Sequence, residues 1–126
     1  MENNTMKIVK VEPGKKAEIA EIVNDLDAMQ ALVGGNIECV YWHDGPFVII
    51  CNEEGKLQGL RPNRALMTED GRITDVIAGT FFIAGVEGDE FTGLSDEQAE
   101  EFRTIYEKPE MFFRLGGGLC MQYMEA

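Results

Sequence analysis

The sequence predicts an α+β fold, with a mostly antiparallel sheet of about four or five strands, a short packed helix over residues 25–33 and an acidic helix from residue 95. Two segments rich in β-branched and aromatic residues flank a turn sequence at 43–46, which predicts a hairpin. Ser95 and Gln98 have the spacing of a capping box, which predicts the start of the acidic helix. The length of 126 residues suits one core, so we expect residues 1–126 to form a single domain.

Composition and charge narrow the class of protein. Hydrophobic residues make up 44% of the chain, which is typical of a globular domain. No apolar run approaches the roughly 20 residues that cross a bilayer, and residues 1–5 lack the features of a signal peptide. We therefore expect a soluble, cytoplasmic protein without a membrane partner. The net charge of −12 repels phosphates, so direct nucleic-acid binding is disfavoured unless the surface carries a local basic patch.

The cysteine content argues against a metal centre and against the disulfide framework of a secreted protein. The three cysteines, Cys39, Cys51 and Cys120, are an odd number, no two are spaced as CxxC, and the chain has one histidine. We expect reduced thiols, no metal and no cofactor.

The first third of the chain predicts a strand, a second strand and a helix. Residues 6–12 are rich in strand-forming residues and stop at the turn dipeptide Pro13-Gly14. Apolar residues then recur at helical spacing over 16–33, which alone favours one long helix. Asn24, followed by acidic residues, is typical of a helix N-cap, so we divide this segment into a strand at about 17–22 and a helix at 25–33.

The hairpin comprises residues 37–42 and 47–51. Both strands are apolar on both faces, which predicts a place in the interior of the sheet with a layer on each side. Further along, Leu57 to Leu60 form a short extended piece in our interpretation, and residues 62–66 a single helical turn that begins with Pro62. Residues 76–84 predict one more strand, centred on 80–83.

The helix that Ser95 opens is expected to run to about Lys108, before Pro109. The tail, residues 109–126, is too apolar for a free linker. It either packs on the domain or contacts another protomer, which would give a homo-oligomer. Glycines 116–118 lack the Lys-Ser/Thr of a phosphate-binding loop and predict a flexible turn.

Several short segments together resemble the domain-of-unknown-function 3846 family, in order and spacing over about residues 6–86. They are Val9–Gly14, the stretch from Leu26 to Gly35, Ile37-Glu38, Cys51–Gly55, Asn63–Leu66 and Ile77–Phe81. The resemblance implies a small domain of bacteria, their phages and mobile elements that usually has no assigned activity, and it supports the division near Asn24. The helix from 95 and the tail lie outside the resemblance.

His43 is the only histidine, and it is the natural general base to pair with a thiol nucleophile. A three-residue hairpin loop would place Cys39 opposite Cys51, with His43 several residues away in the loop. That separation is too large for a catalytic dyad, so core thiols and a turn histidine are the favoured interpretation, and we expect no enzyme activity.

A compact basic set surrounds Pro62. Lys56, Arg61, Asn63 and Arg64 could bind a phosphate or carboxylate at a helix N-terminus, which points to a small anionic metabolite or nucleotide as ligand. The competing interpretation is that Asn63 and Arg64 bond backbone carbonyls and pair with nearby acids, as structural ion-pair networks often do.

Acidic residues are concentrated between Glu87 and Glu110. This segment holds nine acidic and two basic residues and supplies −7 of the net charge. A dense acidic helix face, including Glu97, Glu100 and Glu101, can engage a basic protein surface. The alternative is a solvated face that only confers solubility. We expect an interaction protein of phage or mobile-element type that binds a basic partner, and the alternative function is sequestration of a small anion.

Overall fold

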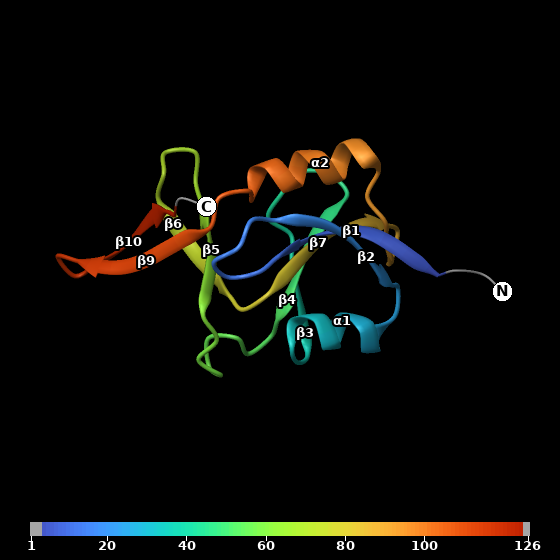
Figure 1. Cartoon of the computed structure of the whole chain (residues 1–126), viewed down its shortest axis with the longest axis horizontal. Coiled ribbons are helices and arrows are strands. Elements are labelled where there is room, and N and C mark those ends of the chain that lie inside the picture. The colour runs from blue at the N-terminus through green and yellow to red at the C-terminus, as the bar shows by residue number, and fades with distance from the viewer. Residues whose placement is uncertain (1–3, 125–126) are drawn as a thin grey trace.

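A six-stranded antiparallel sheet forms the centre of the molecule, which the computed structural model describes over residues 4–124 (Figure 1). Five of its strands follow the order β2-β1-β7-β4-β3, and β8 pairs with the end of β7. Two further hairpins, β5–β6 and β9–β10, are sheets of their own. In chain order the elements are β1 (Thr5–Val11), β2 (Glu18–Val23), α1 (Leu26–Val33), β3 (Ile37–Val40), β4 (Phe47–Asn52), β5 (Pro62–Met67), β6 (Ile73–Ala78), β7 (Phe81–Glu87), β8 (Glu90–Thr92), α2 (Asp96–Ile105), β9 (Glu110–Leu115) and β10 (Gly118–Tyr123).

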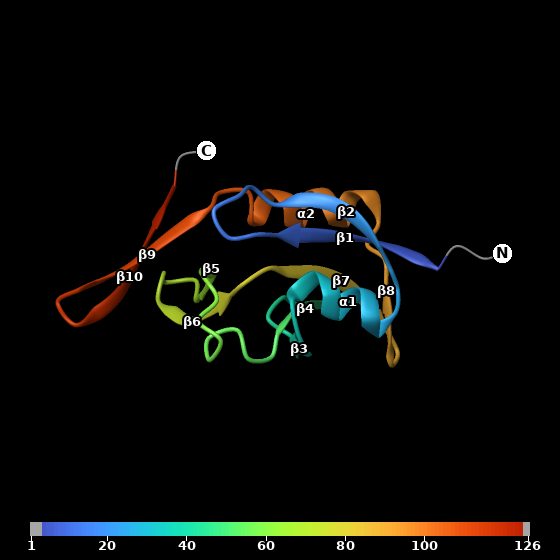
Figure 2. The ribbon, with the colours of Figure 1, turned by 60° about the horizontal axis from the view of Figure 1, so that its bottom comes forward.

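Each face of the central sheet is covered by one helix, as Figures 1 and 2 show. Because side chains alternate along a strand, Phe81 and Ile83 of β7 pack with Phe102 of α2, whereas Phe82 packs with Met29 and neighbouring residues around α1. Burying one such large side chain contributes roughly 1.5–3 kcal/mol. The α+β class and the predominantly antiparallel pairing are therefore confirmed, but the strands form several sheets rather than one of four or five strands.

The predicted division of residues 17–33 is confirmed, since β2 precedes α1. The capping residue differs from the prediction. Asp25 is the N-cap, and its carboxylate accepts a hydrogen bond from the backbone N–H of Ala28. Asn24 instead donates its side-chain amide to the carbonyl of Phe91. Gly34 ends the helix with a φ of 82°, a left-handed conformation that glycine adopts without steric cost.

The capping box of α2 is confirmed in both of its hydrogen bonds. The Ser95 hydroxyl accepts from the backbone N–H of Gln98, and the Gln98 side chain accepts from the backbone N–H of Ser95. The helix ends at Ile105, three residues before the predicted end, and a strand hairpin follows it.

The hairpin 37–51 is confirmed as the antiparallel pair β3–β4, but only β4 is interior, because β3 forms an edge of the central sheet. The helical turn predicted at 62–66 is wrong: Pro62–Met67 is the strand β5, paired with β6. The predicted single strand at 76–84 is also divided. Gly79, with a φ of 82°, separates β6 from β7. Residues 57–59 of the predicted extended piece 57–60 lie in turns.

The tail forms the hairpin β9–β10, which turns at Gly116 and Gly117 and projects from the body (Figure 2). Its base contacts β5, because the Glu110 carboxylate accepts a hydrogen bond from the backbone N–H of Ala65. Met111, Phe113 and Leu115 remain exposed on it. Within the described residues of the tail, the base of this hairpin packs on the domain.

Candidate functional site

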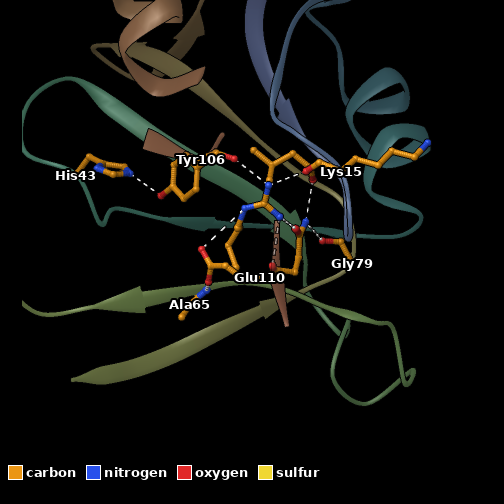
Figure 3. A network of polar contacts seen from close by, with 9 residues as sticks. Lys15, His43, Ala65, Gly79, Tyr106 and Glu110 are labelled. Atoms are coloured by element: carbon orange, nitrogen blue, oxygen red, sulfur yellow. Dashed lines mark hydrogen bonds and ion pairs between the residues drawn. The ribbon is translucent and has the colours of Figure 1, made fainter. Parts of the chain in front are cut away.

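Asn63 and Arg64, two of the four predicted anion-binding residues, are buried. Their hydrogen-bond and ion-pair partners include Lys15, Gly79, Tyr106 and Glu110, which are labelled in Figure 3. The Asn63 side-chain amide donates to the carbonyls of Val11 and Gly79, both at 2.8 Å. Its side-chain oxygen accepts from Nη1 of Arg64 at 2.9 Å. Asn63 thus joins the end of β1 to the turn between β6 and β7.

The guanidinium of Arg64 extends this network to two more parts of the chain. Nη2 donates to the carbonyls of Lys15 at 2.7 Å and Tyr106 at 2.8 Å, and Nη1 also contacts the carbonyl of Asn63 at 3.4 Å. With the bond to the Asn63 side chain, these contacts use the four N–H groups of the two terminal nitrogens. Arg64 therefore fastens the β1–β2 turn and the C-terminus of α2 to β5.

Glu110 is the charged partner in this network. Its Oε2 lies 3.9 Å from Nε of Arg64, which has no hydrogen-bond partner. Burial raises the pKa of Glu110 and lowers the pKa of Arg64, although the two charges oppose both shifts. Both groups thus carry a desolvation cost, and Arg64 stays protonated because a guanidinium does not lose its proton in proteins.

The other two predicted residues lie at the surface. Lys56 is exposed and forms an ion pair with Asp75, whereas the exposed Arg61 has its guanidinium against Gly14. Because β5 is a strand, residues 62–66 offer no helix N-terminus. The structure thus brings Asn63 and Arg64 together in the interior and leaves Lys56 and Arg61 outside their network.

His43 contacts a tyrosine rather than a thiol. Its Nε2 lies 2.6 Å from the Tyr106 hydroxyl, and its ring meets Phe102 edge-on at 4.9 Å between centroids. Burial lowers the pKa of His43 below its ordinary value, despite the nearby Asp44 and Glu101. The neutral imidazole is therefore favoured at neutral pH.

The cysteines do not pair across the β3–β4 ladder. Cys51 lies opposite Glu38, and Cys39 lies opposite Ile50, so the expected pairing of the two thiols is wrong by one residue. Burial, reinforced by Glu38, raises the pKa of Cys51 to about 12. Cys51 is thus a protonated core residue rather than a thiolate nucleophile.

The outer face of α2 carries the predicted acidic residues. Ala99 and Phe102 anchor the helix on the sheet, and Lys7 of β1 pairs with Asp96 at its start. On the outside, Glu97, Glu100 and Glu101 are exposed. They line a shallow hollow with Asp96, Thr104 and Ile105.

Within residues 4–124, Glu100 pairs with Arg103, but neither Glu97 nor Glu101 forms an ion pair. Their spacing of four residues places both carboxylates on one stripe, one turn apart, and Ile105 continues it. Ile105 is 52% exposed. This stripe of Glu97, Glu101 and Ile105 is called the α2 stripe below.

A groove between the hairpins β5–β6 and β9–β10 was not predicted from the sequence. Its volume is about 900 Å³, and Lys56, Arg72 and Arg114 are its cationic lining residues. The grouping depends on how two separate hairpins meet, so no local sequence signal indicates it. The apolar character of the tail was the one available hint.

In the part of the chain that the structure describes, no helix has both the length and the apolar character needed to cross a membrane. Across these same residues, no group of three or more His, Cys, Asp or Glu side chains is arranged to hold a metal ion.

Comparison with known proteins places the chain by family alone. No curated protein and no solved structure gives a significant match. The model of the family described as Domain of unknown function (DUF3846) matches residues 6–107. The match includes α2, which our sequence comparison had left outside the resemblance, and it stops before the β9–β10 hairpin. Since this region spans most of the chain, the protein belongs to the DUF3846 family.

Proposed function

We propose that this protein is a non-enzymatic interaction domain that binds a basic protein through the outer face of α2. The observation that carries the proposal is the α2 stripe, in which Glu97 and Glu101 are exposed and form no ion pair within the described residues. Carboxylates not neutralised by the chain itself are available to Lys and Arg side chains of a partner.

The position of the helix supports this role. Its capping box fixes the first turn, and Ala99, Phe102 and Tyr106 are buried beneath it. The carboxylates therefore project from a rigid element, which lowers the entropy lost on binding. The exposed Ile105 gives the charged stripe an apolar end, and apolar contact at the centre of an interface supplies affinity that charge alone does not.

The distribution of charge supports it as well. Residues 87–110 carry −7 of the net −12, so the field around α2 is strongly negative. Such a field speeds encounter with a basic surface and repels nucleic acid, and it weakens as salt rises. We propose a bacterial or phage-infected cytosol as the compartment, where the three free cysteines would stay reduced.

The proposal is tested by capture from a bacterial lysate at low salt, with quantitative mass spectrometry. The test variant is Glu97→Lys with Glu101→Lys. The control is Glu53→Lys with Glu54→Lys, which changes net charge equally at exposed positions away from α2. We expect a basic protein that wild type and control retain and the α2 variant loses. Equal retention by both variants would contradict the proposal.

Small-anion binding is the second candidate function. It is favoured by the exposure of Lys56 and Arg61, the two predicted ligands outside the buried network. A ligand that binds the folded state raises the unfolding temperature. We expect stabilisation by a member of a nucleotide panel that is lost in Lys56→Ala with Arg61→Ala. Equal stabilisation of this variant would rule out these residues as the site.

A further inference from the structure

The groove between the two terminal hairpins has an apolar floor. Pro62 and Met67 of β5 and Phe112 of β9 line it, and β5 and β9 contact each other near Glu110. The hairpins lie at the same end of the molecule (Figures 1 and 2). The volume of about 900 Å³ lies within the range of specific binding sites.

The walls of the groove are strand edges. Successive side chains of a strand point to opposite faces, so a run of consecutive lining residues indicates that the edge of the strand borders the groove. β6 contributes residues 73–76 without a gap, and β10 contributes 119–121. β9, by contrast, contributes only Phe112 and Arg114, which share one face. The groove is therefore bounded by β6 on one side and β10 on the other.

The free edge of β6 carries a backbone donor at Val76, a residue that lines this groove and also a second hollow beside residues 51–57. Val76 pairs with Ala65, whose own N–H donates to Glu110, so this is a non-hydrogen-bonded pair and the Val76 N–H points away from β5. It donates to the carboxylate of its neighbour Asp75, at 2.8 Å. The same carboxylate pairs with Lys56. It thus occupies the position in which the carbonyl of an added strand would accept this hydrogen bond.

The charge of the groove is opposite to that of the protein. Lys56, Arg72 and Arg114 line it together with one acid, Asp75, in a chain of net charge −12. Among the described residues, Arg72 and Arg114 form no ion pair, and both are exposed. Arginine binds carboxylates through two parallel N–H bonds, so this pair favours an acidic ligand.

We infer that the groove binds an extended segment of another protein that carries alternating apolar and acidic side chains and adds a strand to the edge of β6. Backbone hydrogen bonds to β6 hold the segment. Its apolar side chains contact the floor around Met67 and Phe112, and its carboxylates bind Arg72 and Arg114. This site is separate from the α2 stripe and has the opposite charge preference.

The test is selection from a displayed library of random linear peptides on the wild-type protein at low salt, followed by affinity measurement with the selected peptides. We expect a consensus that alternates apolar and acidic residues. Arg72→Glu with Arg114→Glu should weaken binding by about tenfold or more, equivalent to about 1.4 kcal/mol. The control, Lys15→Glu with Lys16→Glu, makes the same charge change at exposed positions outside the groove and should bind normally.

Two further variants test strand addition itself. Val76→Pro removes the edge N–H, so it should abolish binding of the selected peptides. Asp75→Ala frees that N–H and removes a negative charge that repels the carboxylates of the ligand, so it should tighten binding. This second result does not depend on whether the proline variant folds.

Three outcomes would overturn the inference. The first is a set of selected peptides without acidic residues, or with affinities that Arg72→Glu with Arg114→Glu leaves unchanged. The second is failure to select any peptide while a nucleotide or inorganic phosphate stabilises the protein through these arginines, which would assign the groove to small anions. The third is a dimer in solution that the same variant dissociates, which would assign it to a second copy of the chain.

Discussion

Asn63 links backbone carbonyls that lie far apart in the sequence, because its amide bonds Val11 and Gly79 while its oxygen holds Arg64. A buried carbonyl that loses its partner costs roughly 1–3 kcal/mol. Asn63→Ala is therefore expected to lower the free energy of unfolding by several times that of Asn36→Ala, whose side chain is exposed. Urea denaturation measures both, and equal effects would show that the network adds no stability.

His43 gives the protein a pH dependence of defined sign. Because burial lowers its folded-state pKa below 6.5, the unfolded state binds more protons once the pH falls below that value. The stability from the neutral imidazole is present above about pH 6.5 and is lost as the pH falls toward the folded-state pKa. Wild type should therefore lose more stability than His43→Gln in this window.

Denaturant titrations of both proteins at several pH values measure this difference. Subtracting one pH dependence from the other removes the contributions of the titratable groups that the two proteins share. Glu110, whose pKa is raised, shifts stability in the opposite sense in both. A constant difference across the window would show that His43 is as accessible to protons in the folded state as in the unfolded chain.

At the scale of elements, α2 depends on its first turn. Ser95→Ala removes the acceptor for the backbone N–H of Gln98 and should cost about 1 kcal/mol of the free energy of unfolding. Thr104→Ala is a suitable control, because Thr104 lies on the exposed side of the same helix. Equal stabilities of the two variants would mean that the capping box is dispensable.

The elements that could be predicted are those determined by local chemistry. The helix starts near residues 25 and 95 follow from side chains that bond backbone N–H groups three residues later. Pro62, by contrast, suits both the first turn of a helix and the first residue of an edge strand. Its pairing with Ala78, a residue distant in the sequence, places it in a strand. The β9–β10 pairing depends on Gly116 and Gly117, which read locally as a flexible turn.

The candidate sites, too, could be predicted only where local sequence determines them. Helical spacing alone places Glu97 and Glu101 on one stripe of α2. The burial of Arg64 could not be foreseen, because the carbonyls that receive its N–H groups come from Lys15 and Tyr106, each more than 40 positions away. The groove required two hairpins to meet, so it was missed altogether.

For the molecule as a whole, the net charge of −12 makes the stability of the fold depend on the salt concentration. Like charges around α2 repel one another, and salt screens this repulsion. We expect the thermal unfolding temperature to rise with sodium chloride. Glu97→Lys with Glu101→Lys should be at least as stable as wild type at low salt, with the difference shrinking as salt increases. A marked loss of stability would indicate that these carboxylates support the fold.

The most direct test of the central claim is amide hydrogen exchange of the protein alone and in complex with the partner that the wild type captures. If α2 is the binding element, its amides over residues 96–105 should gain protection in the complex, and high salt should remove that protection. Unchanged exchange over α2, with protection elsewhere on the surface, would contradict the account.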